Sequence, residues 1–271
     1  SNIAHFDQWA SAYATIESIL EIAPEGTGFR DRSRFTSFNN LPALVNMFHL
    51  VADVQLIEDL PDIERPKIIG GKPEVITVPA SEYVKKYIAE LARRAEAVRS
   101  GNVVTQEDNM LIITSNVRNV AIDPRLIDEN APVNEDSKIY AVCRNILRIC
   151  SQFDSEKALQ LAFQDVGIQL YPVMKEYLVQ NGIPDEEIAF IHEANTDKKK
   201  AELFENCRNG DVRVLFGSTA KMGTGTNIQK RLIALHNIDC PWRPSDLEQR
   251  DGRILRQGNM FEEVYIFQYI T

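Results

Sequence analysis

The chain has 271 residues, of which 44% are hydrophobic and 25% charged, and its formal net charge is −9. This composition is typical of a soluble globular protein and excludes a largely disordered chain. No apolar run approaches the roughly 20 residues of a membrane helix, and the polar N-terminus lacks the pattern of a signal peptide. The acidic balance argues against a protein coated with phosphate contacts. Because the chain begins Ser-Asn rather than Met, we expect its ends to be cut boundaries.

The four cysteines point away from a metal or disulfide framework. They are Cys143, Cys150, Cys207 and Cys240, and they form no C-x-x-C pair. Widely spaced cysteines of this kind are expected to be reduced thiols in a cytoplasmic protein. Cys143 and Cys150 lie seven residues apart, so on a helix they share one face, which we expect to be buried.

The first half of the chain is expected to be mainly helical. Apolar residues recur there at helical spacing, and Ser81 is placed to cap a long helix. We predict helices over 4–21, 42–51, 82–99 and 110–121, a short strand over 73–78, and a loop or linker over 60–73. Gly70-Gly71-Lys72 is not read as a phosphate loop, because the spaced leading glycine and the following Ser/Thr are missing. The basic residues of the 82–99 helix, such as Arg93 and Arg94, indicate either a solvated face or a nucleic-acid contact.

The second half alternates strands with helices. We predict a helix over 137–151, strands over 159–163, 187–191, 212–216, 232–235 and 264–269, and helices over 171–180 and 197–207. Strands that alternate with helices of this length imply βαβ units, and so an α/β fold with a parallel sheet and helices on both faces. The boundary is placed near 135, between a helical segment, 1–135, and an α/β domain, 136–271.

A Gly/Thr-rich turn follows the predicted strand that ends at Phe216. In parallel sheets, ligands bind beyond the carboxyl ends of the strands, so residues 217–227 lie at the functional edge. Gly223 and Gly225 would allow close backbone approach, and the Ser and Thr hydroxyls could contact phosphate. Residues 211–258 carry eight Lys/Arg against five Asp/Glu, a charge of +3 that leaves −12 for the rest of the chain. Local positive charge suits an anionic ligand.

Three arginines, Arg250, Arg253 and Arg256, recur at three-residue spacing. On a helix they would share one face, where clustered guanidinium groups are costly unless they meet an anion. Arginine is suited to the charge that develops on a transferring phosphoryl group. The alternative is an ion-pair patch with the neighbouring acids Asp246, Glu248 and Asp251.

These two segments resemble the last two motifs of superfamily 2 helicases, closest to the SWI/SNF-type translocases of double-stranded DNA. The fifth-motif pattern S-T-x-x-x-G-x-G-x-N is matched by Ser218, Thr219, Gly223, Gly225 and Asn227. The sixth-motif pattern is matched by Gln249, Asp251, Arg253, Arg256 and Gly258, with the acidic residue shifted. Further upstream, Asp136-Ser137-Lys138-Ile139 resembles the S-G-K-L that opens the second lobe. The wording of both motifs looks most like the helicase–DNA methylase proteins of phages and conjugative elements.

The resemblance implies a RecA-like C-terminal lobe, 136–271, and assigns roles to its residues. Arg253 and Arg256 would be the catalytic arginine fingers. The ATP-binding residues would be Gly223, Gly225, Gln249 and Arg250, and the DNA-binding residues Ser218, Thr219, Lys221 and Asn195. The implied cofactors, ATP and Mg²⁺, would be held mainly by a first lobe, because the chain has neither G-x-x-x-x-G-K-[ST] nor D-E-x-H. The segment 165–168 is short for this family.

Two functional hypotheses follow. In the first, the chain is the second motor lobe of an ATP-dependent DNA helicase or translocase of the cytoplasm, inactive without its N-terminal partner lobe. Its partners would be that lobe and double-stranded DNA, with no membrane. In the second, the same fold is a catalytically dead module that binds DNA or protein. No His/Cys/Ser constellation supports a small-molecule enzyme.

Overall fold

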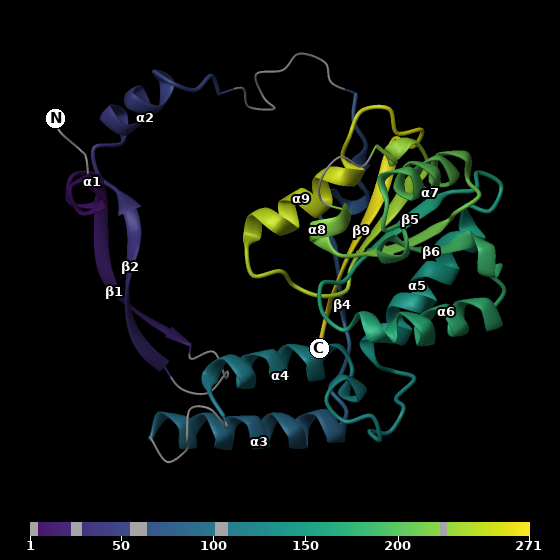
Figure 1. Ribbon diagram of the computed structural model, residues 1–271, viewed down its shortest axis with the longest axis horizontal. Helices are drawn as coiled ribbons and strands as arrows, with labels where there is room; N and C mark the ends of the chain where they lie inside the picture. Colours follow the sequence, from purple (N-terminus) through teal and green to yellow (C-terminus); the bar gives the residue numbers. More distant parts are fainter. Residues whose placement is uncertain (1–4, 23–28, 55–63, 101–107, 223–226) are drawn as a thin grey trace.

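The computed structural model describes residues 5–22, 29–54, 64–100, 108–222 and 227–271. Its described residues form a parallel, seven-stranded sheet in the order β3–β9–β8–β5–β7–β6, with β4 also paired to β9 (Figure 1). The strands are β3 (Lys67–Ile68), β4 (Glu74–Thr77), β5 (Leu159–Phe163), β6 (Ile188–Phe190), β7 (Val214–Gly217), β8 (Leu232–Asn237) and β9 (Glu263–Ile270). The predicted α/β class and the strands of the second half are confirmed.

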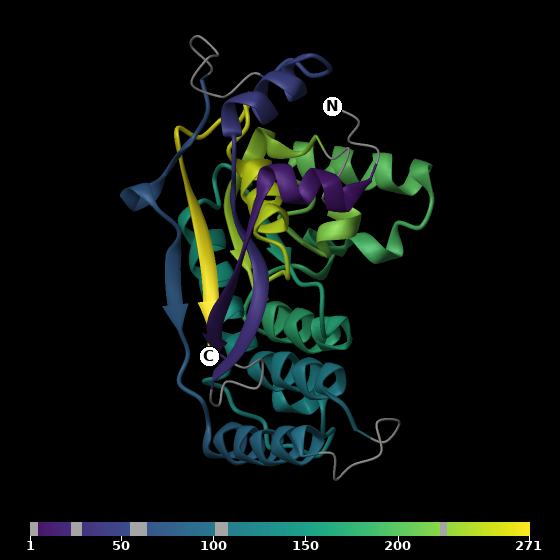
Figure 2. The same cartoon turned by 90° about the vertical axis from the view of Figure 1, so that its left-hand side faces the viewer.

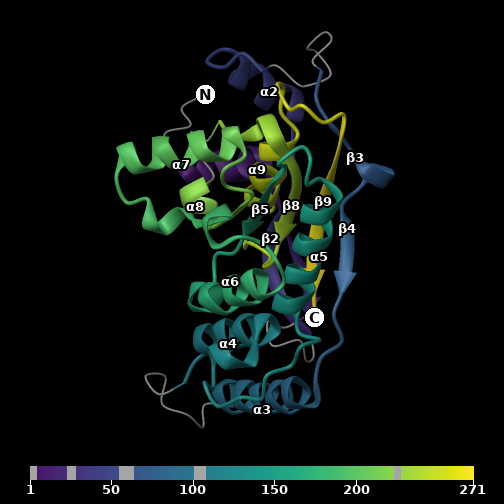
Figure 3. The same ribbon diagram turned by 90° about the vertical axis from the view of Figure 1, so that its right-hand side faces the viewer.

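Helices cover both faces of the sheet. Alternate residues of β5 divide between two cores: Ala162 belongs to the core under α5 (Lys138–Gln152) and α6 (Tyr171–Gln180), whereas Leu161 faces the opposite side. That second core lies under α7 (Asp197–Asn209), α8 (Thr219–Met222) and α9 (Pro244–Ile254). Every residue of β5 is buried, as expected for a central strand covered on both faces. Figure 3 shows α5 and α6 on one side of the sheet.

The helices of the first half lie mostly where the sequence predicts them. They are α1 (Phe6–Tyr13), α2 (Leu41–His49), α3 (Glu82–Arg99) and α4 (Met110–Ile122). The Ser81 hydroxyl accepts a hydrogen bond from the Val84 amide and so caps α3 as predicted. Short 3-10 turns connect the elements: η2 (Ile69–Gly71), η3 (Pro124–Leu126), η4 (Ile168–Leu170), η5 (Asp185–Glu187), η6 (Ile191–Glu193) and η7 (Gln229–Arg231).

The predicted helix over 4–21 is wrong beyond Tyr13. Residues from Ala14 form β1 (Ala14–Ile22), which pairs antiparallel with β2 (Phe29–Phe38). Pairing places Ile16 opposite Phe35, and α1 packs there through the edge-to-face contact of Phe6 with Phe35. A short apolar run with several β-branched residues fits both periods, and cross-strand pairing decides in favour of the hairpin. Figure 2 shows this hairpin toward the viewer, and Figure 1 shows it set apart from the sheet.

The charges of α3 form local ion pairs. Lys85 pairs with Glu82, Arg93 with Glu90 and Arg94 with Asp108, each with an N–O distance of 2.7 Å. Two of these acids lie three residues away on the same helix and the third lies beyond it, and together they neutralise much of this helix surface. The solvated-face interpretation is favoured over a nucleic-acid contact.

The sheet joins the two predicted parts of the chain. β4, from the helical segment, runs parallel to β9 from Glu74 opposite Phe267 to Thr77 opposite Ile270. The boundary near 135 stays a prediction, and a strand from before it completes one edge of the sheet. In the described part of the chain, no helix has the length and apolar character needed to cross a membrane.

Candidate functional site

Three strands of the sheet deliver polar side chains to one point. β5, β7 and β8 are parallel neighbours, so their carboxyl ends lie together. Asp165 follows β5, Thr219 follows β7, and Asp239 follows β8. One Asp239 oxygen accepts hydrogen bonds from the Asp165 amide at 2.7 Å and the Val166 amide at 3.1 Å. The turn after β5 is thereby fixed to the end of β8.

Arg250 lies at the centre of this cluster and is fully buried. Its NH2 group donates to Asp165 at 2.7 Å and to Asp239 at 2.9 Å. The other donors reach Thr219 Oγ1, the Asp239 carbonyl and Asn237 Oδ1. Those five contacts equal the five N–H donors of a guanidinium. In this arrangement the side chain predicted to bind ATP holds three strand ends together and has no donor left for a nucleotide.

The Thr219 hydroxyl is also engaged within the cluster. It donates to Asp165 Oδ2 at 2.8 Å and accepts from Arg250 Nε at 2.8 Å, and its amide donates to Asp165 Oδ1 at 2.6 Å. Thr219 therefore links β5 to α9. A nucleic-acid contact through the same hydroxyl, as predicted, would have to use its remaining lone pair.

Two further ionisable groups border the cluster. Burial lowers the pKa of Lys138 to about 8, although the nearby Asp239 carboxylate raises it in part. Burial raises the pKa of Asp251, whose carboxylate accepts a hydrogen bond from Asn237 at 3.1 Å. In both groups, removal from water disfavours the charged form.

Arg253 and Arg256 lie farther along the chain from Arg250. Because β9 runs parallel to β8, α9 must lead back from the carboxyl edge toward the start of β9. The helix ends at Ile254, so Arg256 lies beyond it, and the predicted single helical face holds for Arg250 and Arg253 only. Arg253 is buried, and its Nε has no hydrogen-bond partner among the described residues. Burial, and next the charge of Arg256, lower the pKa of Arg253.

The predicted nucleic-acid residues occupy two neighbouring segments. α8 is in contact with η6, and Asn195 is exposed just after η6. Ser218 is partly exposed before α8, and Lys221 is exposed on it. Gly217 permits this approach, because a Cβ there would lie 2.4 Å from Ile191 and 2.8 Å from the Met222 sulfur. The structure thus brings Ser218, Lys221 and Asn195 to adjoining positions.

Three predicted ATP-binding residues remain. Gln249 is exposed on α9, and Gly223 and Gly225 lie outside the described residues. The loop between β8 and α9 is anchored to α4: Arg118 donates to the Cys240 carbonyl at 3.1 Å, and its guanidinium lies 4.9 Å from the centre of the Trp242 ring.

Sequence reasoning missed Asp165 and Asp239 as members of the site. Each lies two residues beyond the last residue of a buried strand, Phe163 and Asn237. An acidic residue just past the carboxyl end of a parallel strand is the signal that would have identified them.

A comparison with protein families matches the part of the chain that contains this site. Residues 137–258 match the family described as helicase conserved C-terminal domain. The matched range begins at the start of α5 and includes the whole cluster around Arg250. The fold is that of a helicase C-terminal lobe. It is RecA-like, with a parallel sheet between two helical layers and a mainly helical segment before it.

Three solved structures are similar to parts of this chain. The C-terminal part of the Fun30 ATPase domain is 15% identical and superposes with a TM-score of 0.55, covering 76% of this chain and 86% of that one. Domain 2 of the DEAD-box helicase Mss116p, bound to an RNA duplex, is 17% identical with a TM-score of 0.40, covering 49% of each chain. The DUF1998 helicase MrfA, bound to DNA, is 18% identical with a TM-score of 0.38, covering 48% of this chain.

The chain spans 18% of the length of MrfA and about half of the Mss116p structure. No curated protein matches it. At these identities, the likeness to Fun30 supports the fold.

Proposed function

We propose that this chain is the second motor lobe of an ATP-dependent DNA helicase or translocase. Supporting this is the helicase C-terminal lobe itself, together with two arginines placed near each other on and after α9. The observation that carries the proposal is Arg253, a buried guanidinium with an Nε that has no partner among the described residues. Its pKa is lowered by burial and by the charge of Arg256. An anion bound beside both groups would relieve these costs.

The residues present fit a triphosphate. Arg253 and Arg256 would approach its terminal phosphate and stabilise the charge that develops there, and the exposed Gln249 would border the nucleotide. When bound, ATP with Mg²⁺ supplies the phosphoryl group that is transferred to water, and we expect a first lobe to hold both. Arg250 acts in this scheme by fixing the start of the arginine segment.

The nucleic-acid side of the lobe would be the surface formed by α8 and η6. Ser218 and Lys221 on one segment and Asn195 on the other offer a hydroxyl, a cation and an amide to the phosphate backbone. Thr219 would contribute chiefly by fixing the start of α8. The affiliation with SWI/SNF-type translocases, the resemblance to proteins of mobile elements and the preference for double-stranded DNA belong to the proposal and rest on the sequences of the two motifs. The cytoplasmic location also belongs to the proposal and rests on the widely spaced cysteines.

The arginine fingers are tested by restoring a nucleotide-binding lobe. This chain alone is expected to hydrolyse no ATP, whereas the two-lobe protein should show DNA-stimulated hydrolysis. Arg253→Ala or Arg256→Ala should then lower kcat by about 10³-fold or more, because transition-state charge loses its partner. Arg93→Ala on α3, which removes an exposed arginine paired with Glu90, is the matched control and should leave kcat unchanged. If the two finger variants keep the wild-type rate, the assignment is wrong, and a scaffold that only binds DNA or protein becomes the better description.

A further inference from the structure

Asp165 is the common acceptor for two elements that the proposed function uses separately. Its carboxylate accepts hydrogen bonds from the amide and hydroxyl of Thr219, the first residue of α8. It also accepts one from the NH2 group of Arg250, which lies on α9. Its own amide is held by Asp239. The Asp165 side chain is 28% exposed, whereas the Arg250 side chain is fully buried. The connection between α8 and α9 therefore consists of this partly accessible carboxylate, which contacts both helices, and of the direct hydrogen bond from Arg250 Nε to Thr219 Oγ1.

The connection joins Lys221 to Arg253, because each lies close in sequence to one of the two residues that contact Asp165. Lys221 lies two residues after Thr219, within the four residues of α8. Arg253 lies three residues after Arg250, which is nearly one helical turn. A displacement of α8 by a bound phosphate backbone would pull on Asp165 through two hydrogen bonds. The same carboxylate would then move Arg250, and with it the turn that carries Arg253.

We propose that Asp165 is a positioning residue that couples the nucleic-acid surface on α8 to the arginine segment on α9. This inference rests on the proposed function and deepens it: the site binds nucleic acid at one end and responds at the other. Asp165 touches neither substrate in this scheme. It acts through Thr219 and Arg250, and its loss should separate the two activities of the lobe rather than remove either one.

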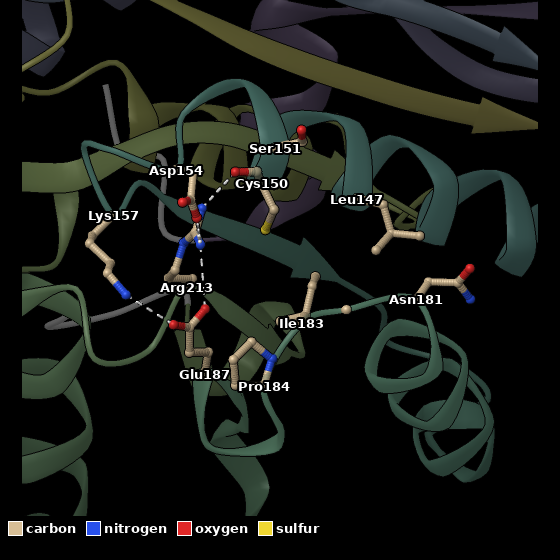
Figure 4. Close-up of a pocket in the computed structure, with 11 residues that line it drawn as sticks. Leu147, Cys150, Ser151, Asp154, Lys157, Asn181, Ile183, Pro184, Glu187 and Arg213 are labelled. Carbon is tan, nitrogen blue, oxygen red and sulfur yellow. Dashed lines mark hydrogen bonds and ion pairs between the residues drawn. The ribbon is translucent and has the colours of Figure 1, made fainter.

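A second buried arginine with a carboxylate partner provides a control for the pair of Arg250 and Asp165. Arg213 is buried at the opposite end of the sheet, where it precedes β7, and it pairs with Asp154 at 2.6 Å (Figure 4). Its other contacts are Glu187 and two backbone carbonyls at the end of α5, those of Cys150 and Phe153. Asp154 thus resembles Asp165 in having a buried arginine partner, but it contacts neither α8 nor α9 among the described residues. It separates the effect of losing an ion pair from the effect of losing the coupling.

The first test uses the chain as it stands. In Asp165→Asn, one carboxylate oxygen becomes an NH2 group that faces the donors of Arg250 and Thr219. Hydrogen exchange should become at least about tenfold faster in both 219–222 and 250–254, because their shared acceptor is lost. Asp154→Asn should leave both segments at the wild-type rate. Faster exchange in only one of the two segments would show that Asp165 does not join them and would overturn the inference.

The second test uses the two-lobe protein with duplex DNA. Asp165→Asn should lower the DNA-stimulated rate of hydrolysis at least about tenfold more than the DNA-free rate, and it should keep the Kd for DNA within about threefold. Asp154→Asn should retain full stimulation. An equal fall in DNA-free and DNA-stimulated rates would make Asp165 merely structural. A wild-type protein without DNA stimulation would instead contradict the proposed function, so the two failures are distinguishable.

A conservative series at Thr219 protects the test against a variant that does not fold. Thr219→Ser keeps the hydroxyl that joins Asp165 to Arg250, and Thr219→Val replaces it with a methyl group of similar size. Stimulation should persist with Ser and fall at least about tenfold with Val. Equal stimulation in the two variants would overturn the inference even if Asp165→Asn cannot be purified.

Discussion

At the scale of single residues, the core of the lobe contains a series of hydrogen-bonded polar side chains that have no part in the proposed function. Buried His236 on β8 contacts Gln160 Oε1 through Nε2 at 3.0 Å and the Tyr269 hydroxyl through Nδ1 at 2.8 Å. Asn145 donates to the same hydroxyl at 3.0 Å. Since Gln160 Oε1 can only accept, Nε2 carries the proton and Nδ1 accepts from Tyr269. In this tautomer the neutral ring is fully hydrogen-bonded.

His236 predicts a pH dependence of stability. Burial, and next the charge of Arg148, lower its pKa from 6.5 to about 3. Between these values the unfolded chain binds a proton that the folded chain does not, so the free energy of unfolding should rise as pH increases from about 3 to 6.5. This difference in pKa between the unfolded and folded chain corresponds to at most about 5 kcal/mol.

Urea unfolding at intervals across this pH range measures the effect, with His236→Gln removing the titrating group. The variant should show a shallower slope than the wild type, and His192→Gln, at an exposed position, controls for the loss of a histidine. Identical slopes for wild type and His236→Gln would mean that the ring is not held neutral.

At the scale of elements, Gly217 controls how closely α8 approaches η6. A Cβ there would lie within 3 Å of Ile191 and Met222, whereas a Cβ at Gly252 on α9 would meet nothing within 4 Å. Gly217→Ala should therefore destabilise the chain by about 1–3 kcal/mol through overpacking. Gly252→Ala, its control, should stabilise by about 0.5–1 kcal/mol, because alanine is the better helix former. The denaturant midpoints of the two variants and the wild type measure these changes. A Gly217→Ala variant as stable as the wild type would contradict the close packing.

Elements with a strong local signal were predictable from the sequence. Ser81 at the start of α3 and the apolar runs of β5 and β8 specify their own structure, because capping and burial act over a few residues. The β1–β2 hairpin was missed because Ile16 and Leu20 fit a helix as well as a strand, and the decision comes from pairing with 29–38. Alternation of Arg30, Arg32 and Arg34 along that segment was the available signal.

The candidate site was predictable in its location and less so in its connections. The predicted strand 212–216 placed the start of the Gly/Thr-rich turn at the carboxyl edge of the sheet, and β7 ends there, at Gly217. Spacing alone could not show that Arg250 and Arg253 have different surroundings. Both lie on one helix, but of the two only Arg250 is hydrogen-bonded to two carboxylates among the described residues. Those carboxylates, Asp165 and Asp239, are 85 and 11 residues from Arg250. Such contacts depend on the order of strands in the sheet, which local patterns do not specify.

At the scale of the whole molecule, the α/β lobe depends on residues that precede the predicted boundary near 135. β4 covers the outer side of β9 along four residue pairs, and the Val78 amide continues this ladder to Ile270 at 2.8 Å. At the end of the chain, the Thr271 hydroxyl donates to the Ala121 carbonyl of α4. A chain that began at the predicted boundary would lose these partners and leave β9 as an unpaired edge.

We therefore expect residues 64–271 to be markedly more stable than residues 136–271. The longer piece keeps β3, β4, α3 and α4 around β9, so its urea midpoint should lie close to that of the full chain. The shorter piece should unfold at lower urea or aggregate, because the backbone donors and acceptors of β9 face solvent. Urea titrations with light scattering compare the three chains, and Thr271→Val in the longest removes only the contact to α4. Equal midpoints for the two pieces would place the boundary near 135 as predicted from the sequence, with β4 only an accessory strand. Unequal midpoints would make β4 part of the α/β lobe.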